Sequence, residues 1–253
     1  MNLEMGPEDV QFQKEFALFS DQILEPIASQ IDNSGVFQSR FFDIAKERKL
    51  LTPFLPIELG GQGKGLQTLT ILLEELGRNS PVASLLVAQQ VIFGIRTILS
   101  DSNLPEREEL AKKAANFDLI LTLAATEFEA GCDLSAITTV CRQKTESCFS
   151  ISGKKAYVNW ASRSGFLFTF TETESTDSAS GTSLFAIPNP SKGLSVGTPY
   201  KTMGFSGLET SPVDFDDCRV EAFQVIGVHG FGDHIFEKIT NELRIAMAAI
   251  ATG

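Results

Sequence analysis

Leu123-Ala124-Ala125-Thr126-Glu127-Phe128-Glu129-Ala130-Gly131-Cys132-Asp133-Leu134 is the stretch of sequence that decides the fold. A short apolar run breaks into Thr-Glu and then into Ala-Gly-Cys-Asp, which predicts a strand that ends in a turn. In such a turn Gly131 lets backbone N–H groups approach a ligand closely, and Thr126 and Cys132 offer short side chains. The turn therefore suits a pyrophosphate or the edge of a heterocycle.

A second informative segment follows, Gly153-Lys154-Lys155-Ala156-Tyr157-Val158-Asn159-Trp160-Ala161-Ser162. With the preceding run 148–152 it predicts a hairpin that turns at Gly153, and its returning strand presents Tyr157 and Asn159 at alternating positions. An aromatic ring beside an amide fits a flat cofactor. Spacing alone favours a plainer alternative, in which both segments are ordinary hairpins of a β-barrel, because short turns with glycine are common.

The two segments resemble the flavin-contacting segments of the acyl-CoA dehydrogenase family, and the likeness extends along the whole chain. Six further segments occur in the same order as in the family. They are a helix start (7–12), a second long helix (41–51), a Pro-x-Glu-x-Gly-Gly-x-Gly loop (56–63), the helix after it (71–78) and two late strands (192–197 and 213–220). This ordered set reverses the preference for ordinary hairpins.

The apolar pattern changes twice along the chain. It has helical spacing to about residue 118, short β-branched and aromatic runs to about 228, and helical spacing again to the end. The resemblance implies an α+β multidomain protein, with an all-α N-terminal helical domain (1–118), an antiparallel β-barrel middle domain (119–228) and the first helix of a C-terminal bundle (229–253). We expect the first helix to end at Pro26 and Glu172–Thr182 to form an exposed hairpin loop.

The resemblance implies FAD as cofactor and an acyl thioester, carried by CoA or by an acyl carrier protein, as substrate. Thr126 and Asn159 would tune the isoalloxazine, Tyr157 would cover it, and Gly131 with Cys132 would line the pyrophosphate and thioester end. The residues implied in cofactor binding are Leu123, Ala125, Thr126, Gly131, Cys132, Tyr157, Val158 and Asn159, and those implied in substrate binding are Cys132 and Arg244.

This sequence departs from the family pattern at several of these positions. Tyr157 stands where a Trp is usual and Asn159 where a Thr is usual, yet a tyrosine can still stack and an amide can still donate. Cys132 replaces a Ser, and Leu123 replaces an aromatic residue. Ser206 stands where many members have Arg.

No catalytic base is identified in this chain. Most family members carry it in the later bundle, and a minority carry it in the first bundle helix, immediately before the residue that corresponds to Arg244. That position is Leu243, and Glu242 beside it is interpreted as a solvated carboxylate about 100° round the helix. We expect the rest of the bundle to be absent, and the apolar face from Phe236 to Ile250 to be exposed and to drive dimerisation or aggregation. The chain alone is then expected to bind FAD weakly or not at all and to show no turnover.

Composition describes an enzyme-sized chain of 253 residues, 43% hydrophobic, enough for one or two domains. A net charge of −11 disfavours binding to nucleic acid. No apolar stretch reaches membrane-spanning length and the N-terminus has no basic leader, which predicts no membrane association and a cytoplasmic location. The four cysteines form no C-x-x-C pair, so we expect buried thiols and no metal, with His229 and His234 in a loop that enters a helix.

The expected function is flavin-dependent α,β-dehydrogenation of an acyl thioester, in lipid metabolism, by a homo-oligomer that passes electrons to a flavoprotein or to oxygen. Two alternatives remain open. The first is a monooxygenase or oxidase of the same fold, and the second is a non-catalytic binding or assembly module.

Overall fold

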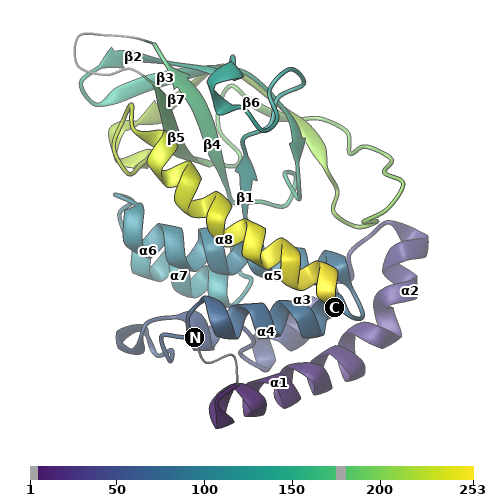
Figure 1. The fold of residues 1–253 in the computed structure, drawn as a ribbon. Coiled ribbons are helices and arrows are strands. Elements are labelled where there is room, and N and C mark those ends of the chain that lie inside the picture. Colours follow the sequence, from purple (N-terminus) through teal and green to yellow (C-terminus); the bar gives the residue numbers. More distant parts are fainter. Residues whose placement is uncertain (1–4, 175–180) are drawn as a thin grey trace.

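A computed structural model describes residues 5–174 and 181–253. Helices gather at one end of the molecule and strands at the other, with one long helix, α8, lying across the boundary (Figure 1). The helical segments are α1 (Pro7–Phe19), η1 (Ser20–Leu24), α2 (Glu25–Ser34), α3 (Ser39–Glu47), η2 (Thr52–Phe54), η3 (Ile57–Leu59), α4 (Leu66–Gly77), α5 (Pro81–Gln89), η4 (Gln90–Thr97), α6 (Ile98–Asp101), α7 (Arg107–Ala115), η5 (Leu134–Ala136), η6 (Ala222–Gln224) and α8 (Gly232–Thr252).

The first helix does not end at Pro26, as the sequence predicted. It continues from α1 through the π-helical turn η1 into α2, which ends where Gly35 adopts a left-handed conformation with φ of 67°. Proline lacks an N–H and crowds the carbonyl four residues before it, so it usually breaks a helix. Here Pro26 is at the start of α2, directly after the wider π turn, and the chain stays helical.

The segments α5, η4 and α6 form one helix of 21 residues, Pro81–Asp101, which is longer and more apolar than the sequence predicted. By length and composition it could cross a membrane, but 83% of its most apolar window is buried inside the protein. The middle of this helix, η4, is π-helical, and all of its residues except Arg96 are buried. Packing inside the folded chain therefore accounts for its apolar character.

The strands form one mixed sheet in the order β6-β7-β3-β2-β4-β5-β8, with β1 also beside β4. Their bounds are β1 (Leu121–Ala124), β2 (Val140–Thr145), β3 (Cys148–Val158), β4 (Phe166–Thr173), β5 (Thr182–Pro188), β6 (Leu194–Val196), β7 (Ser211–Glu221) and β8 (Val225–Ile226). The prediction of an antiparallel barrel was wrong in two respects. β1 and β2 run parallel to β4, and the sheet stays open because β6 and β8 do not pair with each other.

The parallel pairs arise because the chain leaves the sheet and returns to it without reversing. β1 lies along residues 166–169 of β4, and β2 follows in the same direction along residues 172–173. Residues 125–139 leave the sheet between these two stretches. We call this segment the 125–139 loop, and it contains the turn that the sequence analysis singled out.

The predicted hairpin at Gly153 was also wrong. β3 runs straight through Gly153 and pairs with β7 on both sides of it, with a register shift at that point. A side chain there would have no room, because a Cβ would lie 2.5 Å from the Cα of Thr139. The glycine therefore permits a bulge beside a crossing segment rather than a turn. The β4–β5 pair does form a hairpin, although residues 175–180 of its expected loop lie outside the described residues.

A buried amide joins the helices to the sheet. Gln90 of η4 is fully buried, and its Nε2 donates to the carbonyl of Leu119 at 2.7 Å while its Oε1 accepts from the N–H of Leu121 at 3.0 Å. The backbone that passes from α7 into β1 is thus satisfied by a side chain from the helical part. One continuous apolar core includes residues of both parts, such as Phe93 and Phe168, whose rings meet edge to face.

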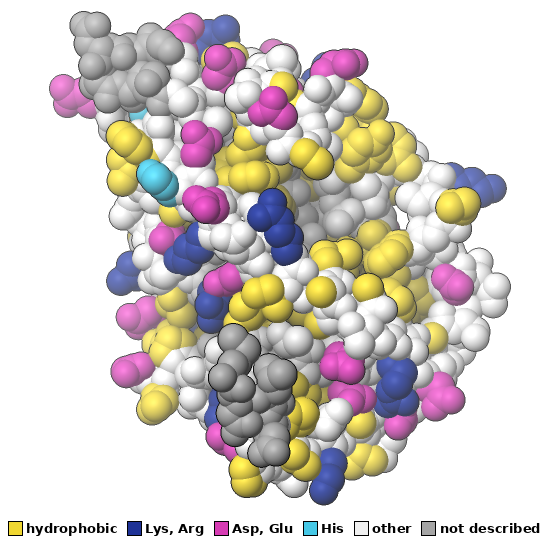
Figure 2. All heavy atoms as spheres, in the orientation of Figure 1, with side chains coloured by type: hydrophobic (Ala, Val, Ile, Leu, Met, Phe, Trp, Pro, Cys, Tyr) yellow, Lys and Arg dark blue, Asp and Glu magenta, His cyan; other side chains and the backbone are white. Residues whose placement is uncertain are grey.

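The apolar face of α8 is covered, contrary to the expectation that it would be exposed. Ile239, Ala246 and Ile250 are each at most 5% exposed, and α8 packs against α4, α5 and η4. The contact with α4 is so close that a Cβ on Gly77 would lie 2.9 Å from the carbonyl oxygen of Ile250. Ile245 and Met247 on the outer side remain more than 40% exposed. Figure 2 shows hydrophobic side chains mixed with charged ones on the surface where Figure 1 draws α8.

Candidate functional site

The two segments chosen from the sequence meet in the fold. The N–H of Ala156 in β3 donates to the carbonyl of Thr126 at 2.8 Å, so the start of the 125–139 loop lies along the end of β3. Thr126 is half-buried, and Tyr157 follows directly after the residue that binds it. The backbone at Ala125 and Thr126 therefore lies next to Lys155 and Ala156, which are 30 positions later in the sequence.

Tyr157 faces outward because β3 is irregular at this point. The register with β7 shifts between Lys155 and Val158, which breaks the alternation of sides, so Lys155 is buried while Tyr157 is 54% exposed. The Tyr157 ring contacts two others, with centroid distances of 5.9 Å to Phe128 and 5.6 Å to Tyr200. This exposed aromatic group offers a surface on which a flat ring can stack.

Asn159 has one end of its amide held by the protein. Its Oδ1 accepts a hydrogen bond from the Thr210 hydroxyl at 2.8 Å, which assigns the amide nitrogen to the other side. Within residues 5–174 and 181–253, Asn159 Nδ2 has no hydrogen-bond acceptor, so it can donate to a ligand. Behind it, Trp160 is 1% exposed and its Nε1 donates to the Gly207 carbonyl at 3.0 Å. Trp160 is therefore a packed core side chain next to Asn159 in the sequence.

A buried ion pair that could not be predicted from the sequence joins the same two segments. Lys155 Nζ is 2.8 Å from Glu127 Oε1, and the two side chains are 0% and 6% exposed. Burial raises the pKa of the Glu127 carboxyl, but hydrogen bonds from Lys155, Thr139 and the Thr138 amide outweigh this and lower it to about 2. Burial lowers the pKa of Lys155 to about 8, against the opposing effect of Glu127. Regular strand alternation would place Lys155 on the same face as Tyr157 and Asn159, so no local pattern in the sequence indicated that Lys155 is buried.

Gly131 and Cys132 lie in the solvent-exposed part of the 125–139 loop. Both are exposed, and a Cβ on Gly131 would meet nothing within 4 Å. The folded chain itself therefore gives no steric reason for glycine at this position. Cys132 is the exposed one of the four thiols, while Cys141, Cys148 and Cys218 are buried and free.

The remaining predicted cofactor residues can contribute little through their side chains. Val158 is 1% exposed in the second apolar core of the sheet, and Leu123 is half-buried against the main core. The carbonyl of Ala125 already accepts a hydrogen bond from Lys155 Nζ at 3.0 Å. Any contact from Leu123 or Val158 to a cofactor would have to come mainly from the backbone.

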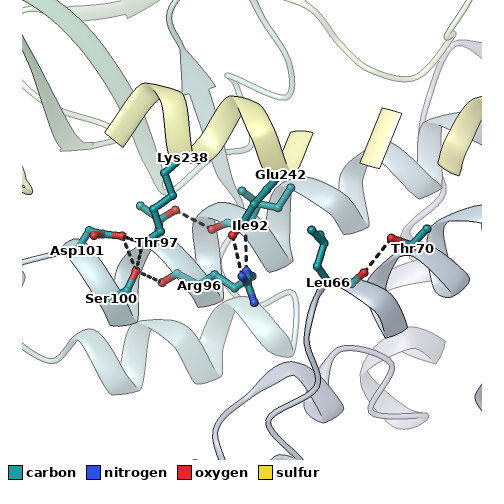
Figure 3. A network of polar contacts seen from close by, with 9 residues as sticks. All are labelled: Leu66, Thr70, Ile92, Arg96, Thr97, Ser100, Asp101, Lys238 and Glu242. Atoms are coloured by element: carbon teal, nitrogen blue, oxygen red, sulfur yellow. Dashed lines mark hydrogen bonds and ion pairs between the residues drawn. The ribbon is translucent and has the colours of Figure 1, made fainter. Parts of the chain in front are cut away.

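The polar residues of α8 are arranged differently from the sequence expectation. Glu242 is not a solvated carboxylate, because its two oxygens accept from Arg96 Nε at 2.9 Å and Nη2 at 2.7 Å (Figure 3). This bond raises the pKa of Arg96, although burial opposes it. Leu243 is half-buried and packs against the core. Arg244 is exposed and donates to Asn241 Oδ1 at 3.1 Å in its own helix, and no described contact joins it to Cys132.

The two histidines flank the start of α8, as a loop that enters a helix requires. His229 comes before the helix and His234 lies in its first turn. His229 Nδ1 is 2.8 Å from Ser183 Oγ, and burial lowers the pKa of the ring. The described residues contain no cluster of three or more His, Cys, Asp or Glu side chains with metal-binding geometry.

Comparisons with known proteins agree with this arrangement. Family profiles described as acyl-CoA dehydrogenase, N-terminal domain, and acyl-CoA dehydrogenase, middle domain, match residues 6–118 and 122–218. The acryloyl-CoA reductase (NADH) of Anaerotignum propionicum is 28% identical over 100% of this chain and 64% of its own length.

Solved structures show the same fold. The butyryl-CoA dehydrogenase of Megasphaera elsdenii superposes with a TM-score of 0.90 at 19% identity, over 99% of this chain and 66% of that one. The FAD complex of PigA superposes with a TM-score of 0.88 at 20% identity, over 99% of this chain and 66% of that one. The chain spans 55% to 66% of the length of the curated relatives it matches. With both domain profiles matched in order and this fold, the chain belongs to the acyl-CoA dehydrogenase family.

Proposed function

We propose that the site formed by the 125–139 loop and the end of β3 binds FAD and works on acyl thioesters, in a flavin-dependent acyl-CoA dehydrogenase. The observation that carries this proposal is the Ala156–Thr126 hydrogen bond of 2.8 Å, because it brings Thr126 beside Tyr157 and Asn159. A hydroxyl, an exposed aromatic ring and an amide with an available N–H then lie in neighbouring positions.

The residues present fit a flavin. Tyr157, which also contacts Phe128 and Tyr200, would offer an exposed aromatic surface to the isoalloxazine. Asn159 Nδ2 is available to donate to a ring nitrogen, and the open space at Gly131 allows close approach to the backbone. When bound, FAD would accept the hydride from the substrate's Cβ.

The protein's own groups would bind, orient and shield. Thr126 and Asn159 would set the orientation of the ring through hydrogen bonds, and Tyr157 would cover it and exclude water. Cys132 and Gly131 would line the pyrophosphate and thioester end, with Arg244 on the substrate side. A thiol is a poor hydrogen-bond partner, so Cys132 would contribute mainly by packing.

The similarities support an acyl thioester as the substrate class. The Anaerotignum relative is named a reductase of acryloyl-CoA and the Megasphaera neighbour a dehydrogenase of butyryl-CoA, which are opposite directions of redox chemistry on an acyl-CoA. An acyl thioester exchanging hydrogen at Cα and Cβ is the part common to both. We propose an electron-carrying flavoprotein as redox partner, with oxygen as the alternative acceptor.

Titration of the 253-residue chain with FAD, followed by the visible spectrum and by flavin fluorescence, tests this proposal. Tyr157→Ala should weaken binding roughly five- to tenfold, because aromatic stacking contributes about 1 kcal/mol. Phe223→Ala removes another exposed aromatic residue, on η6, and is the matched control. No FAD binding at any concentration, or equal affinities of the two variants, would contradict the proposed site.

A further inference from the structure

The 125–139 loop is held by groups at its two ends. At its start, the N–H of Glu127 donates to the carbonyl of Ala130 at 2.8 Å. At its end, the N–H groups of Thr138 and Thr139 donate to the Glu127 carboxylate at 2.7 and 3.0 Å, and the Thr138 hydroxyl donates at 2.7 Å. One carboxylate thus closes the base of the loop where the chain leaves the sheet and returns to it.

Lys155 attaches this closed loop to β3. Its ammonium donates to Glu127 Oε1 at 2.8 Å and to the carbonyl of Ala125 at 3.0 Å, and the side chain is 0% exposed. The next residue, Ala156, donates to Thr126. Three consecutive loop residues, 125–127, are therefore held by two consecutive residues of one strand.

The attachment decides where the site residues stand relative to one another. Thr126 lies between the two residues that Lys155 binds, while Tyr157 and Asn159 follow Lys155 on the same strand. A buried charge has a large desolvation cost, so the ammonium remains in place only while both acceptors surround it.

We propose that Lys155, acting with Glu127, is a positioning residue that presets Thr126 against Tyr157 and Asn159 before a cofactor binds. This inference rests on the proposed function only for the identity of that cofactor. Lys155 is too deeply buried to touch cofactor or substrate, and it acts through the loop backbone. At neutral pH the Lys155 side chain is mostly protonated, because burial lowers its pKa only to about 8.

The first test is hydrogen exchange on the 253-residue chain without cofactor. In Lys155→Met, the amides of Ala130, Thr138 and Thr139 should exchange roughly ten- to a hundredfold faster than in the wild type, because hydrogen bonds to charged groups are lost. Amides of the β4–β5 hairpin should change only as far as global stability changes. Lys154→Met is the matched control, since Lys154 is the neighbouring lysine and its 77% exposed side chain pairs with Asp214 on the surface.

The second test is FAD affinity, measured on the same variants by fluorescence titration. Lys155→Met should weaken FAD binding at least about tenfold and Lys154→Met should leave it unchanged, because only the buried lysine holds the loop. If Lys155→Met does not fold, the neutral pair Lys155→Met with Glu127→Gln removes the unpaired buried carboxylate and should fold while the loop stays loose.

The outcomes separate the inference from the proposed function. Unchanged loop exchange in a folded Lys155 variant would overturn the positioning role, and so would a loosened loop with unchanged FAD affinity. A wild type that binds no FAD would contradict the proposed function alone, because the loop exchange would still report whether Lys155 holds the site residues.

Discussion

Arg96 and Glu242 form a two-point ion pair, with nitrogen–oxygen distances of 2.7 and 2.9 Å, across 146 positions of sequence. It joins α8 to the π-helical middle of the helix Pro81–Asp101, and Lys238, one turn earlier in α8, pairs with Asp101 (Figure 3). The Arg96–Glu242 and Lys238–Asp101 ion pairs therefore add to the apolar packing of α8 against the helical part of the chain.

Glu242→Gln should destabilise the chain by about 1–2 kcal/mol, because Arg96 loses a charged hydrogen-bond partner while remaining half-buried. Urea unfolding at neutral pH measures this. Glu237→Gln, an exposed carboxylate on the same helix, is the control and should change stability by less than about 0.5 kcal/mol. Equal stabilities of the two variants would show that the Arg96 pair contributes nothing measurable.

Acid should weaken the fold through Glu127. Its pKa in the folded chain is about 2, below its ordinary value of 4.5, so its contribution is complete above 4.5 and disappears as pH falls through 2. The shift corresponds to about 3 kcal/mol. Urea unfolding between about pH 6 and pH 2 should show this loss in the wild type and a shallower one in Glu127→Gln. Parallel pH profiles would refute the assignment.

Gly77→Ala should lower stability by about 1–3 kcal/mol, because the new Cβ would lie 2.9 Å from the Ile250 carbonyl oxygen and push α8 away from α4. For Gly131→Ala we expect the opposite effect on stability. Nothing lies within 4 Å of a Cβ there, so stability should stay nearly unchanged while FAD affinity falls. Thermal unfolding and FAD titration of both variants check the pair. A stable, fully FAD-binding Gly131→Ala would argue against ligand approach at this turn.

One thiol should react quickly with a disulfide reagent in the native chain. Cys132 is exposed, whereas burial raises the pKa of Cys141 to about 12 and of Cys218 to about 11 and keeps Cys148 covered as well. Thiol counting with and without denaturant should give one fast group and then four. Cys132→Ser should remove the fast phase, and its persistence would place the reactive thiol elsewhere. FAD should slow the reaction if Cys132 lies at the cofactor site.

Much of the fold could be predicted from local pattern. The change from helical to strand spacing, the final helix and the loop before it follow from the periodicity of apolar residues and the placement of glycine and proline. The errors arose where a residue's role depends on distant neighbours. Pro26 lies inside a continuous helical run because a π turn precedes it, and Gly153 permits a bulge because Thr139 crosses it.

The candidate site divides in the same way. Thr126, Tyr157 and Asn159 could be selected from sequence because residue type and motif order identify them. The bond between Ala156 and Thr126 that joins them, and the role of Thr210 in orienting Asn159, depend on contacts between separate strands.

The sequence by itself determined the order of helices and strands and the motifs of the acyl-CoA dehydrogenase family, because these depend on residue type and short-range spacing. Only the tertiary structure decided that the sheet is open and mixed and that the inner face of α8 is covered. It also decided that Lys155 pairs with Glu127 and that Glu242 pairs with Arg96. Burial and ion pairing are properties of positions in space. Lys155 and Glu127 are 28 positions apart in the sequence, and Arg96 and Glu242 are 146 positions apart. Local sequence patterns carry no information about pairing across such separations.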